Sequence, residues 1–402
     1  MRVSMVIPTY WSRPRDIGWQ PGDAIFDHPT PVDTEGTLGR TLKSLEILNN
    51  KNFTLYIILV TTTPDIVEDA YRKVVEIVAE NTPRGIDYRI FGHRELEKLS
   101  REIEEYSSIL SLRGYSDVRN MCIVAPFIGS NPDSIIFIDD DEVFEDPGFV
   151  DTALEMMGEE IEGGRMWAKA GYYLQPDGDY LVKKPFRPWM RYWNQYEAMN
   201  QAFLEFIKSP GRFKVVPFVF GGNMVIHREL FTRIPFDPGV PRGEDIDYLI
   251  NARFFGYRFY IDTKLSIKHL PPPKEHPIWR QLLVDFERFL WEREKLRLQR
   301  GESCASRVRP EDFDPYPGTF LKDDLEEKIY RATELLAFEY MSKGDYESAS
   351  RAIENLTALE EFKNSMGDPF DEFLDLQNSW IEFIKKVDAD RERLKERIWH
   401  TR

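Results

Sequence analysis

Two hydrophobic patterns alternate along the first 145 residues. Nearly continuous apolar runs, which are typical of buried strands, cover residues 2–7, 53–60, 88–91 and 134–138. Apolar residues at the spacing of amphipathic helices occupy residues 37–48, 65–80 and 116–125. We expect Pro8 to end the first strand and Asp65 to cap the second helix. Strands that alternate with helices predict a doubly wound α/β sheet, with ligands at the carboxyl ends of its strands.

The pattern is less regular after residue 145. It predicts strands at 166–174, 215–220 and 259–267, a helix at 192–207 and a long charged helix at 278–300. Residues 301–320 are rich in Pro, Asp and Arg, which indicates a linker. About three helices follow in residues 322–398, the last with Asp368 as N-cap and Pro369 at its first position. The chain therefore predicts a C-terminal all-helical extension.

Composition narrows the class of protein. The 402 residues give room for one large α/β domain and a smaller one, and 42% of them are hydrophobic. A net charge of −16 argues against a general nucleic-acid binder. Cys122 and Cys304 are too few for a disulfide framework or a structural zinc site, so we expect a reducing, cytoplasmic compartment. No run of about 18 apolar residues predicts a transmembrane segment.

Three consecutive aspartates end the strand predicted at 134–138, in the sequence IIFIDDDEVF. Carboxylates this close repel one another, so either water screens them or a cation neutralises them. Carboxylate oxygens are the ligands that Mg²⁺ and Mn²⁺ prefer, often beside a substrate phosphate. Asp139 and Asp141 therefore predict a divalent metal next to a phosphorylated ligand. A solvated acidic turn is the alternative.

Five short motifs give these aspartates a context. In order they are IPTY (7–10), DVRN (117–120), IDDD (138–141), GGNM (221–224) and GEDID (243–247). In this order and spacing, residues 1–275 resemble the catalytic domain of GT-A glycosyltransferases, as in the inverting family 2 enzymes. The resemblance implies a GT-A fold, a Rossmann-like doubly wound mixed sheet.

The same resemblance divides the chain into parts. The nucleotide-binding half would span about residues 1–145 and the acceptor half about 146–275. A lid, a long helix and a linker would follow at 276–320, and a C-terminal helical domain at 321–402. Lys274, His276 and Arg280 would belong to the lid.

The resemblance also implies an activity, the transfer of a hexose from a GDP- or UDP-hexose donor to a hydroxyl of a soluble acceptor. Asp141 and His269 would bind Mn²⁺ or Mg²⁺, and Asp139 would bind it through water or hold the ribose. His269 could instead be structural. The residues that would contact the donor are Pro8, Thr9, Tyr10, Arg119, Asn120, Asp139, Asp140, Gly221, Gly222 and Asn223.

Transfer to a hydroxyl needs a base that takes the hydroxyl proton. By the resemblance Asp245 is this base, and Glu244 holds the acceptor or supports the helix N-terminus. Acids are also favoured at a helix N-terminus by the helix dipole alone. Trp189 and Trp193 could stack on an acceptor sugar or pack in the core.

Two departures from the family pattern leave questions open. Residues 61–63 are threonines where an Asp usually reads the nucleobase, so the base is not predicted. An insertion at 12–37 could build part of the site or an interface, and the C-terminal helices could join subunits. The alternative functions are a retaining GT-A synthase of a sugar-glycerate-type solute, a nucleotidyltransferase and a non-catalytic nucleotide-sugar-binding protein.

Overall fold

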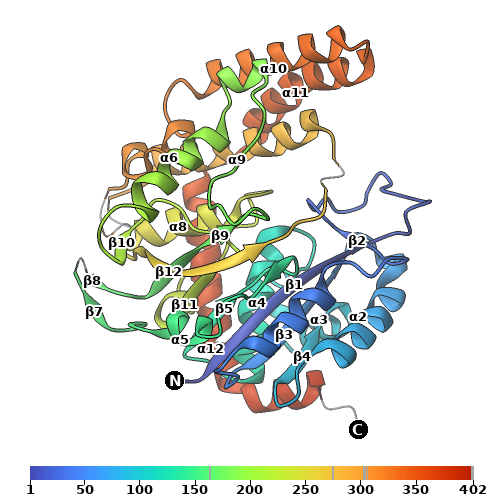
Figure 1. The fold of residues 1–402 in the computed structure, drawn as a ribbon, viewed down its shortest axis with the longest axis vertical. Helices are drawn as coiled ribbons and strands as arrows, with labels where there is room; N and C mark the ends of the chain where they lie inside the picture. Colours follow the sequence, from blue (N-terminus) through green and yellow to red (C-terminus); the bar gives the residue numbers. More distant parts are fainter. Residues whose placement is uncertain (163, 274–275, 302–304, 306, 400–402) are drawn as a thin grey trace.

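A computed structural model describes residues 1–162, 164–273, 276–301, 305 and 307–399. These residues form one ten-stranded sheet in the order β10–β12–β9–β11–β5–β1–β3–β4, with β2 beside β1 and β6 beside β12 (Figure 1). The strands of this sheet are β1 (Val3–Ser12), β2 (Thr30–Pro31), β3 (Thr54–Thr61), β4 (Asp87–Phe91), β5 (Ser134–Phe137), β6 (Glu142–Val143), β9 (Ala168–Leu174), β10 (Phe213–Val215), β11 (Met224–His227) and β12 (Phe259–His269). Strands β7 (Glu160–Ile161) and β8 (Gly164–Arg165) form a separate pair.

Helices cover the sheet and extend beyond it. The α-helices are α1 (Leu38–Ser44), α2 (Val67–Asn81), α3 (His93–Glu102), α4 (Tyr115–Gly129), α5 (Phe149–Leu154), α6 (Gln195–Ile207), α7 (Arg228–Phe231), α8 (Glu244–Phe254), α9 (Ile278–Leu298), α10 (Leu325–Ser342), α11 (Tyr346–Ser365) and α12 (Pro369–Trp399). The 3₁₀ helices are η1 (Leu45–Ile47), η2 (Pro64–Ile66), η3 (Glu104–Tyr106), η4 (Pro188–Arg191), η5 (Pro310–Phe313) and η6 (Gly318–Phe320).

Strand direction defines the fold class. Strands β4, β3, β1 and β5 are parallel to one another, whereas β11 runs antiparallel between β5 and β9. Beyond β9 the sheet continues with β12 in parallel and ends with the antiparallel β10. The predicted mixed α/β sheet, followed by the C-terminal helices α10 to α12, is confirmed.

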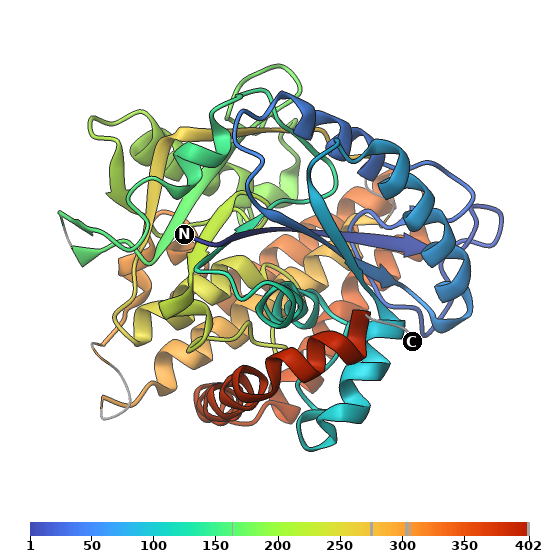
Figure 2. The same cartoon turned by 90° about the horizontal axis from the view of Figure 1, so that it is seen from below.

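The sheet is buried between two helical layers. Figure 2 shows α1 and α2 on one face and α12 on the other. Alternate residues of β3 point to opposite layers, as a strand buried on both faces requires. Leu55 and Ile57 join the apolar cluster beneath α1, α2 and α5, whereas Tyr56 and Ile58 join the cluster with α3, α4, α8 and α9.

The C-terminal helices share a core with the helices on one face of the sheet. Figure 1 shows α10 and α11 beyond α9, and α12 running back along the sheet. Phe373, Trp380 and Val387 of α12 belong to the same buried cluster as α4 and α8. Asp368 Oδ1 accepts the backbone N–H groups of Phe370 and Asp371, which confirms the predicted cap of α12. The domain boundaries themselves stay a prediction.

Trp380 offers a test of this shared core. Its ring is fully buried and its Nε1–H donates to the carbonyl of Phe231 at 3.0 Å. Trp380→Ala is expected to lower the free energy of unfolding by about 3–5 kcal/mol, because it leaves a cavity and an unpaired carbonyl. Urea denaturation measures this, with Lys385→Ala on the exposed face of α12 as control. Equal stability of the two variants would mean that α12 packs only loosely.

Two predicted boundaries in the first half are wrong. Pro8 does not end β1, which continues to Ser12. On the side of β1 that faces β5, the carbonyl of Val6 accepts the N–H of Ile138. The backbone nitrogen of Pro8, two residues later, points to the same side, but β5 has already ended there. A missing N–H therefore costs no ladder bond there. Asp65 does not cap α2 but lies in η2, where it binds Arg13.

Two predictions in the second half also fail. The predicted strand at 215–220 lies mostly outside β10, and the four-residue β11 was missed. Residues 216–223 instead form a loop that passes beneath the acid motifs. The predicted linker contains buried side chains, because Phe313, Tyr316 and Phe320 pack into the core.

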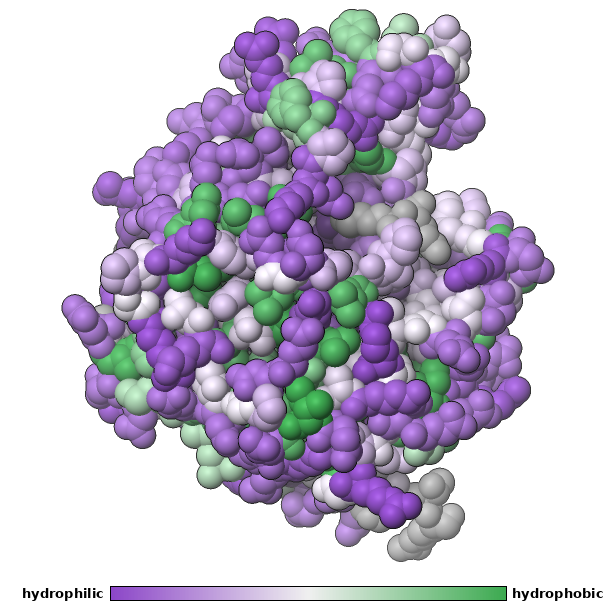
Figure 3. All heavy atoms as spheres, in the orientation of Figure 1, coloured by the Kyte–Doolittle hydropathy of each residue, from purple (hydrophilic) through white to green (hydrophobic). Residues whose placement is uncertain are grey.

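The face drawn in Figure 3 is largely hydrophilic, with scattered apolar side chains. No helix in the described ranges is long and apolar enough to cross a membrane.

Candidate active site

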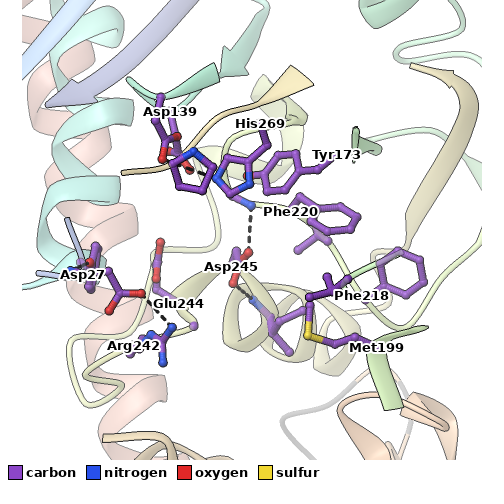
Figure 4. A pocket seen from close by; sticks show the side chains of 18 of the residues that line it. Asp27, Asp139, Tyr173, Met199, Phe218, Phe220, Arg242, Glu244, Asp245 and His269 are labelled. Atoms are coloured by element: carbon purple, nitrogen blue, oxygen red, sulfur yellow. Dashed lines mark hydrogen bonds and ion pairs between the residues drawn. The ribbon is translucent and has the colours of Figure 1, made fainter. Parts of the chain in front are cut away.

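A cavity of about 420 Å³ opens at the carboxyl ends of β1, β5 and β12, beside the N-terminus of α8. This is the edge of the sheet at which the sequence predicts a ligand site. Figure 4 shows Asp139, His269 and Tyr173 on one side of it and Glu244 and Asp245 on another. The sequence-predicted residues that line it are Tyr10, Arg119, Asp139, Asp140, Asp141, Gly221, Glu244, Asp245 and His269.

A cluster of acids follows β5, in which Asp139 and Asp140 are half-buried and Asp141 and Glu142 are buried. Burial and the charge of Asp141 raise the pKa of Asp140 to about 8, and its Oδ2 accepts the hydroxyl of Thr9 at 2.6 Å. Burial also raises the pKa of Asp139, and burial with the Asp139 charge raises that of Glu142. Glu142 Oε1 has no hydrogen-bond partner in the described part of the chain. A bound cation would relieve the repulsion between these carboxylates, which contributes to their raised pKa values.

His269 brings an imidazole to this cluster from the end of β12. Its Nε2 lies 3.5 Å from Asp141 Oδ2, and its ring stacks on Tyr173 with the centroids 4.6 Å apart. Carboxylate oxygens with one imidazole suit Mn²⁺ or Mg²⁺. No three acidic, His or Cys side chains of the described residues are already arranged as metal ligands. Asp141 and His269 lie close enough to bind one cation together, whereas the Asp139 carboxylate points to Arg119.

Arg119 of α4 joins the acid cluster to α8. One terminal nitrogen donates to Asp139 Oδ1 at 2.9 Å, and Nε donates to Glu244 Oε1 at 3.0 Å. Its other terminal nitrogen, Nη1, has no partner among the described residues. A buried guanidinium between two carboxylates fixes the relative positions of β5 and α8. The free N–H groups suit an anionic ligand in the cavity.

Asp245 is held by the backbone. Its Oδ2 accepts the N–H of Gly221, and its Oδ1 accepts the N–H of Ile246, both at 2.8 Å. Burial and the charge of Glu244 raise the pKa of Asp245 to about 6. A carboxylate with such a pKa is charged near neutral pH and basic enough to accept a proton. The arrangement can therefore perform general-base chemistry.

Gly221 and Gly222 are required by close packing. A Cβ on Gly221 would lie 2.5 Å from a terminal nitrogen of Arg119. A Cβ on Gly222 would lie 2.1 Å from Glu142 Oε1 and 2.6 Å from Asp139 Oδ2. The loop after residue 220 can therefore pass beneath the acids only with glycine at both positions.

Gly222→Ala is expected to lower the free energy of unfolding by about 1–3 kcal/mol, because the methyl group would displace buried carboxylates. Gly301→Ala is the matched control, since nothing lies within 4 Å of its Cβ position. Urea denaturation of both variants measures the difference. Wild-type stability in Gly222→Ala would show that the side chains of Asp139 and Glu142 can move aside without cost.

Several residues that the sequence predicts for donor binding lie behind the cavity wall. Asn120 donates to the carbonyl of Phe236 and accepts its N–H, so its amide does not reach the cavity. The Asn223 amide donates to the carbonyls of Tyr172 and Leu265. The remaining predicted positions that do not line the cavity are buried Pro8, Thr9 and Gly222.

Trp189 and Trp193 are core residues and do not line the cavity. Both rings are buried, at 5% and 1% exposure. The Trp193 ring packs on Phe286 and Phe320, with centroids 4.6 and 4.8 Å away. Of the two readings, core packing is confirmed.

The insertion at 12–37 supplies residues that motif matching missed. Asp27 lines the cavity, and its Oδ2 accepts from Arg242 at 2.8 Å. Phe26 packs on Tyr10 and Tyr115, with ring centroids 4.4 and 5.0 Å away. The insertion therefore builds part of the cavity wall.

The insertion also covers the threonines at the end of β3. Thr62 donates its N–H to Trp11 and accepts the N–H of Ala24. Of the expected lid, His276 contacts the carbonyl of Phe26, and Arg280 lies over the ring of Trp19, 4.0 Å from its centroid. Lys274 lies outside the described residues.

The described residues form one mixed α/β sheet, with acidic groups on two sides of one cavity. No known protein-family profile and no curated protein sequence matches it. Similar solved structures include the mannosyltransferase PcManGT from Pyrobaculum calidifontis in complex with GDP-Man and Mn²⁺, at 12% identity and a TM-score of 0.45, covering 96% of this chain and 87% of that one. Glucosyl-3-phosphoglycerate synthase from Mycobacterium tuberculosis, in complex with Mn²⁺ and UDP-glucose, is similar at 14% identity and a TM-score of 0.35, covering 72% and 76%. GalNAc-T7 with UDP, GalNAc and Mn²⁺ is similar at 12% identity and a TM-score of 0.41, covering 82% and 53%.

Proposed function

We propose that this protein is a metal-dependent hexosyltransferase that uses a GDP- or UDP-hexose donor and inverts the anomeric centre. The observation that supports this most is the division of acids around one cavity. Asp139, Asp141 and His269 gather at the strand ends, whereas Asp245 stands at the N-terminus of α8. Transfer needs these two chemical capacities at separate places, one for the leaving diphosphate and one for the acceptor.

Asp245 would act on the acceptor hydroxyl. As the charged carboxylate it takes the hydroxyl proton while the hydroxyl oxygen forms a bond to C1 of the hexose. The bond from C1 to the diphosphate oxygen breaks, and its electron pair leaves with the diphosphate. The N–H of Gly221 and the N–H of Ile246 hold the carboxylate in place during this step.

The diphosphate would lie on the other side of the cavity. Asp141 and His269, with Asp139, would hold a divalent cation, which neutralises the charge that develops on the leaving diphosphate. Arg119 adds fixed positive charge between this side and Glu244. The cavity buries these groups, which strengthens their interactions with an anion.

The acceptor would occupy the part of the cavity near Asp245. Its wall includes Tyr196, Phe203, Phe218 and Phe220, and aromatic faces suit the apolar face of a sugar ring. A small soluble sugar or polyol is the proposed acceptor.

The anomer of the product separates inversion from retention. Purified protein is incubated with α-linked GDP- and UDP-hexoses, Mn²⁺ and a panel of sugars and polyols, and the product is examined by proton NMR. A β-linked hexose supports the proposal. An α-linked hexose would favour the retaining sugar-glycerate-type synthase, in which Asp245 is not a base of this kind.

A further inference from the structure

Helix α9 carries a polar stripe that is buried. Arg288, Glu292 and Lys295 are 4%, 0% and 0% exposed, and their spacing puts them on one face of the helix. Charged residues are almost never fully buried unless they are paired. This face of α9 lies against α8, which carries Glu244 and Asp245. The sequence placed α9 outside the catalytic domain, so its contact with α8 was not expected.

Lys295 fixes the body of α8. Its ammonium group donates to Asp247 at 2.8 Å and to Asn251 at 3.1 Å, both on α8. It also donates to Asp237 in the loop before α8, at 2.5 Å. Breaking such a buried pair costs several kcal/mol, so α9 holds α8 firmly in position.

Arg288 of α9 lies against the N-terminus of α8. Its Nε donates to Glu292 at 2.8 Å, and its Nη1 lies 3.5 Å from the hydroxyl of Tyr316. Gly243 has a φ of +73°, and a Cβ there would lie 2.0 Å from Arg288 Nη1. The guanidinium therefore fills the space of a side chain at residue 243, two residues before Asp245. Arg288 Nη2 has no hydrogen-bond partner among the described residues.

We propose that Arg288 is a positioning residue of the transfer reaction, which packs against Gly243 and so fixes the N-terminal turn of α8 that carries Asp245. This inference rests on the proposed function, because it assigns Asp245 as the base. It places part of the catalytic apparatus in the segment after residue 275.

The charge balance around Asp245 supports this role. The groups that face its carboxylate come from α8, α4, α9, the segment around Tyr316 and the loop at Gly221, and they are Glu244, Arg119, Arg288, Tyr316 and the N–H groups of Gly221 and Ile246. Burial and Glu244 raise the pKa of Asp245, whereas Arg288 and Arg119 lower it. Arg119 is already shared between two carboxylates. Arg288 is therefore the cation whose removal changes Asp245 most directly.

The sign of the effect follows from the role of a base. Asp245 works when it is deprotonated, so donor consumption falls as the pH drops through the Asp245 pKa of about 6. Loss of the Arg288 charge raises that pKa. In Arg288→Met the acid limb of the pH profile of kcat/KM is expected to move upward by about one pH unit. Arg288→Lys keeps the charge and is expected to return the limb toward its wild-type position.

The profiles are measured on the full chain, with one nucleotide-hexose and saturating Mn²⁺ at every pH. Glu292→Gln is the matched control, because it disturbs the same buried cluster but keeps the cation, so its acid limb must not rise. Arg288→Gln replaces the Met variant if that variant does not fold.

Two outcomes would overturn the inference while leaving the proposed function intact. One is an acid limb that is the same in Arg288→Met and the wild type. The other is an equal upward movement in Glu292→Gln, which would indicate a merely structural effect. A wild-type protein that consumes no nucleotide-hexose would overturn both the proposed function and this inference.

Discussion

Asp141→Asn is expected to abolish metal-dependent donor binding and to lower turnover on the order of 10²–10³-fold, since a bound cation stabilises the leaving charge by several kcal/mol. The fold should survive. The side chain of Asp141 contacts His269, and removal of one charge relieves repulsion within the acid cluster. Calorimetry with GDP or UDP and Mn²⁺, beside urea denaturation, measures both effects.

A neighbouring acid provides the control for this variant. Glu145 is exposed and lies 3.5 Å from Lys268, so Glu145→Gln should bind metal and nucleotide as the wild type does. His269→Ala should lose less affinity than Asp141→Asn and shift the preference from Mn²⁺ toward Mg²⁺, because it removes the nitrogen ligand. Normal Mn²⁺-supported turnover by Asp141→Asn would rule out its role as a metal ligand.

Asp245→Asn is expected to lower turnover on the order of 10²–10⁴-fold, the usual contribution of a general base. The substitution keeps the size of the side chain and its ability to accept the N–H of Gly221. Donor and metal affinity should therefore change little, since the loss concerns the transition state alone. Turnover and calorimetry on the same preparation test the two parts together.

The pair of variants distinguishes two roles for acids in one cavity. If Asp245→Asn turns over normally, Asp245 is not the base and a retaining mechanism becomes the better account. If it loses donor affinity as severely as Asp141→Asn, both acids serve the donor side. Only a loss of turnover with intact donor binding supports the proposed division.

The strands with continuous apolar runs could be predicted because burial on both faces leaves a strong signal. Residues 53–60 match β3 almost residue for residue. The four residues of β11 carry too little pattern to be recognised after two glycines. The sequence predicts that β1 ends at Pro8 because proline cannot donate a ladder hydrogen bond. It does not show that β5 ends before Pro8, so that no such bond is needed there.

The site could be predicted where local motifs mark it. Tyr10, Asp141 and Asp245 come from three motifs, and the fold gathers them around one cavity. Motif matching cannot tell a residue that lines the cavity from one that lies behind its wall, as Asn120 and Asn223 do. Contacts between distant segments leave no local pattern. Asp27 with Arg242, and Arg288 with Gly243, are of this kind.

The most direct test of the central claim is the release of nucleoside diphosphate from GDP- and UDP-hexoses, followed by chromatography. Wild-type protein is compared with Asp141→Asn, each with Mn²⁺ or with EDTA, in the presence of soluble sugars and polyols. The account predicts that one donor is consumed by the wild type with Mn²⁺, that EDTA stops the reaction, and that Asp141→Asn is nearly inactive. No consumption of any donor by the wild type, or equal consumption in EDTA, would contradict it.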